Sequence, residues 1–342
     1  TIEELAMLGG RRVLLVISGG IAAYKSAILV RRLRQAGAQV DVVMTASAEK
    51  MVGPATFHAL SGRPVYTSLW TEPLAHVELG RDADLGIVAP ATANLLARMA
   101  HGLADDMASA TLLAAACPLL VCPAMNVRMW EHQATQENIT SLIARGVYIL
   151  GPAVGELAEG ESGAGRMVEP EEILQAAARL LAPASTLTDR KVIVTAGPTR
   201  AAVDPVRYVG NRSSGRMGFE LAAEAWRRGA RVVLIAGPTT VPLPHGPTVV
   251  RVETTAEMAG ALEKELADAD VLVMAAAVSD FQVSDPADEK IKRRPEASVE
   301  LRLEAGPDLL AETRAIREAN GVFTLGFALE SEDGVANASR KL

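Results

Sequence analysis

RRVLLVISGG (residues 11–20) is an apolar segment that ends in a serine and two glycines, and IAAYKSAILVRRLRQAG (21–37) follows it with an amphipathic pattern and a glycine stop. QVDVVMT (39–45) is again apolar. A strand, a helix and a strand in this order predict a βαβ unit with parallel strands. Further strands are expected at 84–92, 118–124 and 146–150. The first half is therefore predicted to form a parallel sheet with helices on both faces.

The same pattern restarts after a small-residue linker at 183–189. KVIVTAGPT (191–199) is predicted to be the first strand of a second sheet. Helices of this half are expected at 213–230 and 256–269, and its later strands at 231–237, 270–280 and 321–330. We therefore expect two doubly wound α/β domains, at 1–182 and 190–342. The chain stops in a helical pattern, where such a sheet normally continues, so the second domain is expected to be incomplete at its C-terminus.

The composition excludes some classes of partner. The chain has 342 residues, 49% of them hydrophobic, and a net charge of −7, which argues against a nucleic-acid surface and an anionic membrane surface. The uncharged segment 107–127 is broken by Pro118 and Pro123, so a spanning helix is not expected. Cys117 and Cys122 lack the spacing of metal ligands and are expected to be reduced thiols of a cytoplasmic protein.

Small and polar residues follow the first two strands. Ser18, Gly19 and Gly20 precede a helix, and Thr45 and Ser47 follow the next strand. Ligands of parallel sheets bind beyond the carboxyl ends of the strands, and a helix N-terminus favours a phosphate. A plain tight turn explains the glycines about equally well. Because the GxGxxG fingerprint is missing, a mononucleotide fits better than a dinucleotide.

Two later strand ends have the same character. ATAN (91–94) offers a hydroxyl and an amide among small residues, although Thr92 could simply cap a helix. VCPAMNVRMW (121–130) places one amide, Asn126, among apolar side chains. Four such ends meeting at one edge predict a ligand crevice. His76 lies at an element boundary, where a lone histidine is more often a surface or structural residue.

The second half has a dense basic stretch, VTAGPTRAAVDPVRYVGNRSSGRMG (194–218). Its arginines and its glycine- and serine-rich helix start suit a polyphosphate. A solvated basic loop is the simpler alternative, which the acidic net charge of the chain makes less attractive. Lys290 and Lys292 could add positive charge, although isolated charge runs usually face solvent.

Several of these motifs together resemble a known family. SGGIAAYK, AHVEL, PAMNVRMW, GPTRAAVDPVRYVGNRSSGRMG, AAAVSD and EKIK, in this order, are similar to the bifunctional coenzyme A biosynthesis flavoproteins. The resemblance implies a flavodoxin-like phosphopantothenoylcysteine decarboxylase domain that binds FMN. It also implies a Rossmann-like phosphopantothenate–cysteine ligase domain that uses CTP with Mg2+. The implied substrates are 4′-phosphopantothenate, L-cysteine, CTP and 4′-phosphopantothenoylcysteine, and the implied assembly is a homo-oligomer built from trimers and dimers with the flavin between subunits.

The resemblance also implies roles for residues of the first domain. Asn126 would bind the cysteine-derived carboxylate, and His76 would act as a base or orienting group in a redox-neutral decarboxylation. Glu159 stands where the family has a flap cysteine and could donate a proton in its place. The residues implied to bind FMN are Ser18, Gly19, Gly20, Ile21, Thr45, Ser47, Ala91, Thr92, Ala93, Asn94 and Met125.

In the second domain, the resemblance implies that Asn211 stabilises an acyl-cytidylate, Arg207 supports the attack by cysteine, and Lys290 neutralises phosphate charge. The residues implied to contact CTP are Met274, Ala275, Ala276, Asp280, Lys290, Pro307, Asp308, Leu309, Leu310, Phe327 and Lys341. Two alternatives stay open. One is an FMN-binding regulatory protein on the same scaffold with impaired turnover, and the other is an NAD(P) oxidoreductase, which the missing fingerprint opposes.

Overall fold

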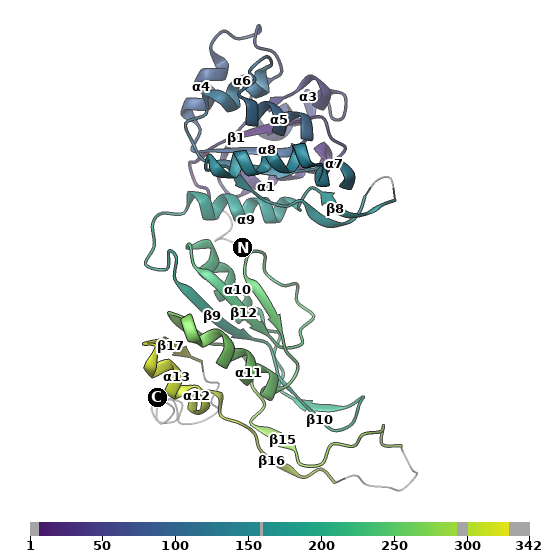
Figure 1. Ribbon diagram of the computed structural model, residues 1–342, viewed down its shortest axis with the longest axis vertical. Helices are drawn as coiled ribbons and strands as arrows, with labels where there is room; N and C mark the ends of the chain where they lie inside the picture. The colour runs from purple at the N-terminus through teal and green to yellow at the C-terminus, as the bar shows by residue number, and fades with distance from the viewer. Residues whose placement is uncertain (1–6, 158–159, 293–299, 328–342) are drawn as a thin grey trace. The chain divides into compact units, whose positions relative to one another are not determined.

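The chain forms two compact units, Thr1–Leu181 and Ala182–Leu342, each built around a parallel sheet (Figure 1). The computed structural model describes residues 7–157, 160–292 and 300–327. Both sheets carry helices on their two faces, so the predicted fold class, two doubly wound parallel-sheet units, is confirmed.

The sheet of the first unit has the order β3-β2-β1-β4-β5-β6, with every described pair parallel. Its strands are β1 (Arg12–Ile17), β2 (Gln39–Met44), β3 (Val65–Tyr66), β4 (Leu85–Ala91), β5 (Leu119–Pro123) and β6 (Tyr148–Ile149). The order changes direction between β1 and β4, and this switch point is where open parallel sheets hold their ligands.

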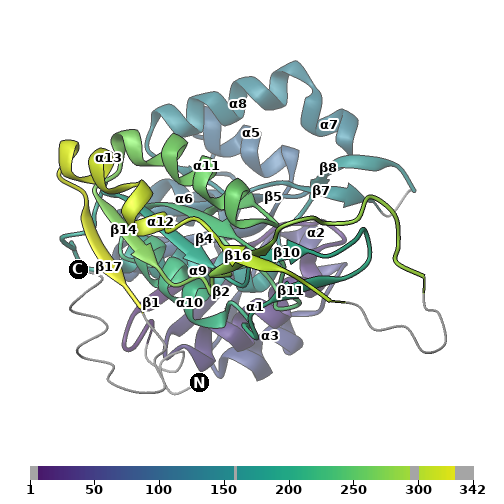
Figure 2. The same ribbon diagram turned by 90° about the horizontal axis from the view of Figure 1, so that it is seen from below.

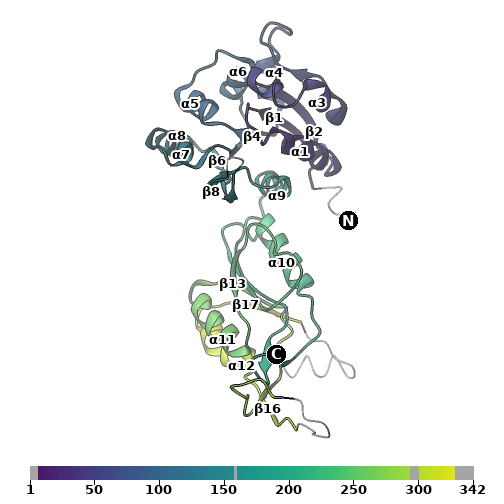
Figure 3. The ribbon, with the colours of Figure 1, turned by 90° about the vertical axis from the view of Figure 1, so that its right-hand side faces the viewer.

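Helices cover both faces of this sheet, and Figure 3 shows α5 and α8 on the side opposite α1. The helices are α1 (Ala23–Gln35), α2 (Ala46–Glu49), α3 (Pro54–Ser61), α4 (Ala75–Asp82), α5 (Ala93–His101), α6 (Met107–Ala114), α7 (Val127–Glu131), α8 (Gln133–Ala144) and α9 (Pro170–Leu181). Strand residues Val16 and Val121 share one apolar cluster with Leu95 of α5 and Leu142 of α8. Because β1 and β4 are buried on both faces, they carry continuous apolar runs instead of an alternating pattern.

An antiparallel hairpin follows β6 and consists of β7 (Ala153–Glu156) and β8 (Ser162–Arg166). Figure 2 shows it beside α7. Glycines of β8 allow this close packing, since a Cβ on Gly165 would lie 2.3 Å from the carbonyl oxygen of Met125. The backbone N–H of Met125 donates to the carbonyl of Gly165 at 3.0 Å. The hairpin is therefore held directly over the turn that leads into α7, and we call it the flap.

The sheet of the second unit has the order β13-β12-β9-β14-β17. Its strands are β9 (Lys191–Ala196), β12 (Arg231–Ala236), β13 (Thr248–Arg251), β14 (Val271–Met274) and β17 (Phe323–Gly326). Helix α10 (Arg216–Arg227) covers one face, and α11 (Thr255–Glu265), the 3-10 turn η2 (Leu266–Asp268), α12 (Leu309–Glu312) and α13 (Arg314–Ala319) cover the other. Two hairpins extend from the strand ends, β10 (Arg200–Ala202) with β11 (Tyr208–Gly210), and β15 (Phe281–Val283) with β16 (Leu303–Ala305).

The sequence missed the two-residue strand β3, strand β13 and both hairpins of the second unit. These strands have two to four residues, too few for a periodic pattern to emerge. The uncharged segment 107–127 contains α6 and β5, and β5 lies within the strand expected at 118–124. Within the described ranges, no helix combines the length and the apolar character that crossing a bilayer requires.

Candidate active sites

The first candidate site lies at the carboxyl ends of β1 and β2. A Cβ on Gly19 would lie 2.3 Å from the Cβ of Ser47, so only glycine lets these two strand ends approach this closely. Among the described residues, the backbone N–H groups of Gly19, Ile21 and Ala22 donate to no other residue. Unpaired N–H groups before a 13-residue helix are a suitable cradle for a phosphate, so this strand end fits the predicted mononucleotide.

The hydroxyl residues of this edge are partly committed to the protein itself. The buried Ser18 hydroxyl donates to the carbonyl of Pro90 at 2.7 Å and accepts from the N–H of Thr92 at 2.9 Å. It therefore ties the end of β1 to the end of β4, and its side chain acts as a structural link. Thr45 and Thr92 cap α2 and α5 by accepting backbone N–H bonds. A cap uses a lone pair of the hydroxyl and not its proton, so both residues keep a donor for a ligand.

The third and fourth strand ends are adjacent, as predicted from the sequence pattern. Ala91 pairs with Pro123, and its carbonyl accepts from the N–H of Ala124 at 3.0 Å. Ala91 itself is buried, Ala93 is half-buried and Asn94 is exposed. The side chain of Asn94 and the exposed Ile21 are thus accessible to a ligand at this edge.

Asn126 caps α7, and its side chain also reaches the flap. Its Oδ1 accepts from the N–H of Arg128 at 2.8 Å, and its Nδ2 donates to Oε2 of Glu161 at 3.2 Å. Arg128 Nη2 lies 3.7 Å from the other oxygen of Glu161. The amide of Asn126 therefore already holds a carboxylate, which is the chemical group predicted for this position. Met125 packs partly buried against the core beneath the flap.

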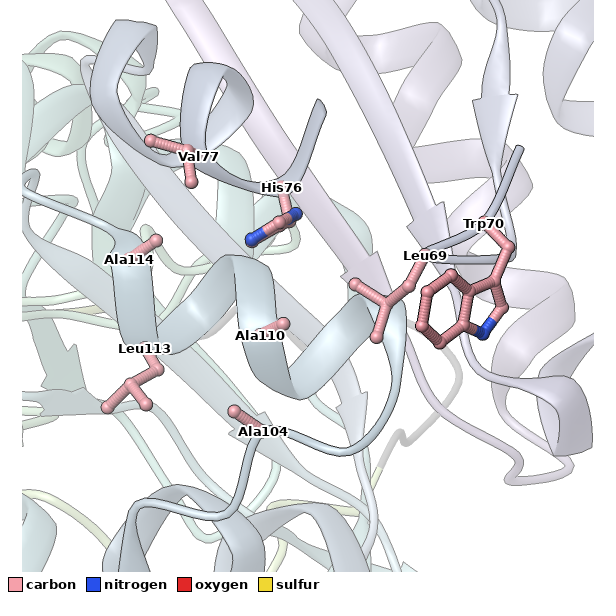
Figure 4. A pocket seen from close by; sticks show the side chains of 8 residues that line it. All are labelled: Leu69, Trp70, His76, Val77, Ala104, Ala110, Leu113 and Ala114. Atoms are coloured by element: carbon pink, nitrogen blue, oxygen red, sulfur yellow. The ribbon is translucent and has the colours of Figure 1, made fainter. Parts of the chain in front are cut away.

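His76 lies on the first turn of α4 and lines a pocket of about 430 Å³. Figure 4 shows its imidazole facing Ala110 of α6 across an otherwise apolar lining. Its Nδ1 atom is buried and has no hydrogen-bond partner among the described residues. Trp70, 90% exposed, forms the rim. The pocket lies between His76 and α6. None of the residues predicted to bind the flavin at the switch point of the sheet lines it.

The second candidate site lies at the carboxyl ends of β9, β12 and β14. A Cβ on Gly237 would lie 1.9 Å from the carbonyl oxygen of Pro198, so the turns after β9 and β12 touch through backbone. Gly215, with φ of 75°, caps α10, and the hydroxyl of Ser214 accepts from the N–H of Arg216 at 3.4 Å. This glycine- and serine-rich helix start is where the sequence predicts a polyphosphate.

The turn after β14 gathers most of the remaining predicted residues. Asn211 Nδ2 donates to the carbonyls of Val278 at 2.7 Å and Ala277 at 3.3 Å. The carbonyl of Met274 accepts from the N–H of Phe327 at 3.1 Å, and the carbonyl of Asp280 accepts from the N–H of Gly306 at 2.8 Å. The structure therefore places Asn211 against the turn that follows Met274, Ala275 and Ala276. It also places Phe327 beside Met274, and Gly306, the residue before Pro307, beside Asp280.

Part of this set serves the fold as well. Asp308 caps α12 by accepting from the N–H groups of Leu310 and Ala311, and Leu309 is buried in the core. Arg207 and Lys290 belong to two segments that are joined through Ile291, because Arg207 Nη2 donates to its carbonyl at 2.6 Å. Lys290 itself is exposed.

Two family models match the chain in succession. Residues 1–182 match a model described as Flavoprotein, and residues 187–342 match the DNA/pantothenate metabolism flavoprotein C-terminal domain. The coenzyme A biosynthesis bifunctional protein CoaBC of Vibrio vulnificus is 44% identical over 98% of this chain and 84% of its own length. The CoaBC protein of Mycobacterium tuberculosis is 48% identical over 94% of this chain and 80% of its own length. The chain belongs to the CoaBC family.

Two solved structures are each similar to about half of this chain. The FMN-dependent cysteine decarboxylase SpaF has a TM-score of 0.45 and 32% identity over 52% of this chain and 97% of its own. The C-terminal domain of a CoaBC protein has a TM-score of 0.40 and 31% identity over 46% of this chain and 74% of its own.

Some expectations for this CoaBC family member lie outside the described residues, namely those for Glu159 and Lys341. Both cysteines are unpaired, and burial raises their pKa values, most strongly for Cys122. Neither is therefore poised as a thiolate. In the described part of the chain, no group of three or more histidine, cysteine or acidic side chains could hold a metal ion.

Sequence reasoning missed two contacts of these sites. Glu161 was not singled out, although it follows the predicted flap residue Glu159 by two positions and contacts Asn126. Asp204, the lone acid in the basic stretch 194–218, binds Arg207. An acid in the middle of a basic stretch is the signal that could have identified Asp204.

Proposed function

We propose that the chain performs two consecutive steps of coenzyme A biosynthesis. Residues 190–342 join 4′-phosphopantothenate to L-cysteine at the expense of CTP, and residues 1–182 decarboxylate the product to 4′-phosphopantetheine with FMN. The observation that carries the proposal is the 44% identity to a bifunctional CoaBC protein over 98% of this chain, because it spans both candidate sites. The alternative of a regulatory FMN-binding protein is not favoured by these bifunctional relatives.

In the decarboxylase site, the backbone of Gly19 to Ala22 would hold the FMN phosphate, with Thr45 and Ser47 as hydroxyl donors. The unpaired N–H groups before α1 support this role. Bound FMN supplies the oxidation of the substrate thiol that makes loss of CO2 easy. Ala91, Thr92, Ala93 and Asn94 line the edge at which its ring system would lie.

Asn126 would hold the substrate carboxylate next to the flavin. A neutral amide suits this task, because a cation would stabilise the carboxylate in the ground state and slow its departure. The existing bond between Asn126 and the Glu161 carboxylate supports this assignment. His76 would take the proton of the substrate thiol, and its buried, unpartnered Nδ1 supports a role towards a ligand. Glu159 would return a proton from the flap.

Among the described residues, the pocket beside His76 is lined by none of the predicted flavin residues. We therefore propose that the complete site forms between subunits, in an assembly built from trimers and dimers. The exposed Trp70 and Ile21, at the His76 pocket and the phosphate cradle respectively, support burial of both regions in such an assembly. The reduced thiols suit the proposed cytoplasmic location.

In the ligase site, CTP with Mg2+ would lie against the turn after β14, between Met274 to Asp280 and the start of α12. Asn211 supports the acyl-cytidylate by fixing this turn through the carbonyls of Ala277 and Val278. Lys290 would neutralise phosphate charge, and Arg207 would support the attack by the cysteine amine. Lys341 is proposed as a further contact.

Three measurements on the purified chain test this function. The chromophore released on denaturation should be FMN. The protein should release CO2 from 4′-phosphopantothenoylcysteine, and it should couple 4′-phosphopantothenate to cysteine only in the presence of CTP and Mg2+. A chain that binds FMN but turns over neither substrate would instead favour the regulatory alternative.

A further inference from the structure

Asp204 is a buried carboxylate that is paired with Arg207, a residue of the proposed ligase site. Its side chain has no exposed surface, although it lies between β10 and β11 in the basic stretch 194–218. Its Oδ1 accepts from the backbone N–H groups of Val206 and Arg207, both at 2.8 Å. Its Oδ2 accepts from Arg207 Nε at 2.8 Å and also contacts Arg207 Nη2. One carboxylate therefore fixes both the backbone and the guanidinium of Arg207.

The same carboxylate reaches a segment more than 80 residues further along the chain. Oδ2 of Asp204 accepts from the backbone N–H of Ile291 at 3.1 Å. Arg207 Nη2 donates to the carbonyl of the same residue at 2.6 Å, and the N–H of Ala287 donates to the carbonyl of Val203 at 2.9 Å. Both peptide groups of Ile291 are thus bound by the Asp204–Arg207 pair. Lys290 is its covalent neighbour, so its backbone position depends on this pair.

The charge state of Asp204 suits this role. Burial raises its pKa, but hydrogen bonds from Val206, Arg207 and Ile291 outweigh burial and hold the pKa below the usual range. The group is therefore charged at neutral pH, and hydrogen bonds to a charged acceptor are stronger than those between neutral groups. A buried carboxylate that lost these donors would be poorly compensated.

We propose that Asp204 is a positioning residue of the ligase reaction, which holds Arg207 and Lys290 in one fixed arrangement so that both cations act on the same substrate. The proposal rests on the proposed CTP-dependent ligase function. Without Asp204, Arg207 would lose its anchor and residues 287–291 would lose one of their attachments to the β10–β11 hairpin. The two cations would then spend only part of their time in the productive geometry.

Asp204→Asn tests this role with little change in shape. The asparagine keeps one oxygen for the N–H groups of Val206 and Arg207, so the turn remains. Its NH2 group, however, faces the N–H donors of Arg207 and Ile291 and cannot accept from them. We expect kcat of CTP-dependent coupling to fall on the order of 100-fold, as misplaced catalytic groups commonly cause. We also expect the amide of Ile291 to exchange with deuterium faster than in the wild type.

Asp270→Asn is the matched control. Asp270 binds Arg190 Nη1 at 2.6 Å and the N–H of Lys191 at 2.8 Å, the same combination of arginine and backbone donors. It lies before β14, at the opposite edge of the sheet from the candidate site. This variant should keep wild-type ligase kinetics and Ile291 exchange. If both variants reduced kcat equally, a general loss of stability would explain the result, and the positioning role would be overturned.

Two further variants separate positioning from folding. Ile291→Pro removes the N–H donor of the segment while Asp204 and Arg207 stay in place, and it should also lower kcat, even if Asp204→Asn fails to fold. Lys290→Ala combined with Asp204→Asn should lower kcat by less than the product of the two single losses, because the effect of Asp204 on Lys290 is already gone while its effect on Arg207 remains. Fully additive losses, or wild-type kcat in Asp204→Asn, would overturn the proposal. A wild-type chain that consumed no CTP would instead overturn the ligase function itself.

Discussion

The Nδ2 atom of Asn126 lies 3.2 Å from a carboxylate oxygen of Glu161, so the flap occupies the amide that is proposed to receive the substrate. Arg128 supports the same carboxylate from 3.7 Å. A substrate carboxylate at Asn126 would meet this negative charge at close range. Glu161 therefore either moves aside when the substrate binds, or stays in place and weakens binding by repelling the substrate carboxylate.

Glu161→Gln should make the substrate easier to bind. The glutamine keeps the size of the side chain but removes the charge, which is worth about 0.2–1 kcal/mol for a partly exposed group, or roughly a 1.5- to 5-fold decrease in KM for 4′-phosphopantothenoylcysteine. CO2 release at varied substrate concentration measures it. Glu156→Gln, an exposed residue on the other strand of the flap, is the control and should leave KM unchanged. An unchanged or higher KM in Glu161→Gln would show that Glu161 does not compete with the substrate.

Gly19→Ala should weaken flavin binding. The new Cβ would lie 2.3 Å from the Cβ of Ser47, so one of the two strand ends has to shift. Overpacking of this kind costs about 1–3 kcal/mol, which corresponds to roughly a 5- to 150-fold higher Kd for FMN if the shift falls on the phosphate cradle. Flavin fluorescence quenching during titration measures the Kd. Gly53→Ala, where a Cβ meets nothing within 4 Å, should bind FMN normally. Normal binding by Gly19→Ala would place the phosphate elsewhere.

His76→Gln should separate flavin binding from turnover. If His76 is the base, its loss should lower kcat for CO2 release by about 10²- to 10⁴-fold. FMN content should stay unchanged, because His76 lies outside the proposed flavin-binding set. The control is His58→Gln, since His58 only contacts the carbonyl of Arg63 at the surface. A variant with full decarboxylase activity would return His76 to the structural interpretation that its sequence position first suggested.

The sequence predicted the framework of both units because buried parallel strands leave long apolar runs. The runs at 11–20 and 191–199 became β1 and β9, the central strands of the two sheets. Their ends also located the predicted ligand sites, since a strand that stops in glycine or serine marks the carboxyl edge. Periodicity alone did not reveal the short hairpins, whose strands have three to five residues.

The contacts made by single side chains were less predictable. Nothing in the order of residues indicates that Asp204 reaches Ile291, because the two meet only after β10–β11 and the segment past β15 have folded. The sequence equally gave no sign that the Ser18 hydroxyl would be consumed by Pro90 and Thr92. Such pairings depend on loop paths, which hydrophobic pattern does not encode.

Asp270→Asn should flatten the acid dependence of the stability of the second unit. The N–H of Lys191 and the guanidinium of Arg190 lower the pKa of Asp270 below its ordinary value, while burial opposes them. A group whose pKa is lower in the folded state stabilises it fully above the unfolded pKa of about 3.9, and this contribution disappears as the pH falls through the folded pKa. The free energy of unfolding of the wild type should therefore decrease more steeply below about pH 5 than that of the variant.

Urea unfolding at a series of pH values measures this difference. Trp226 is the one tryptophan within 182–342, so its fluorescence reports the second unit once Trp70 and Trp130 are replaced by phenylalanine. The two stability curves should be furthest apart at neutral pH and should converge in acid, where the carboxylate is protonated in both states. Curves that stayed parallel down to low pH would mean that Asp270 contributes through packing, and that its bonds to Arg190 and Lys191 carry no charge-dependent stabilisation.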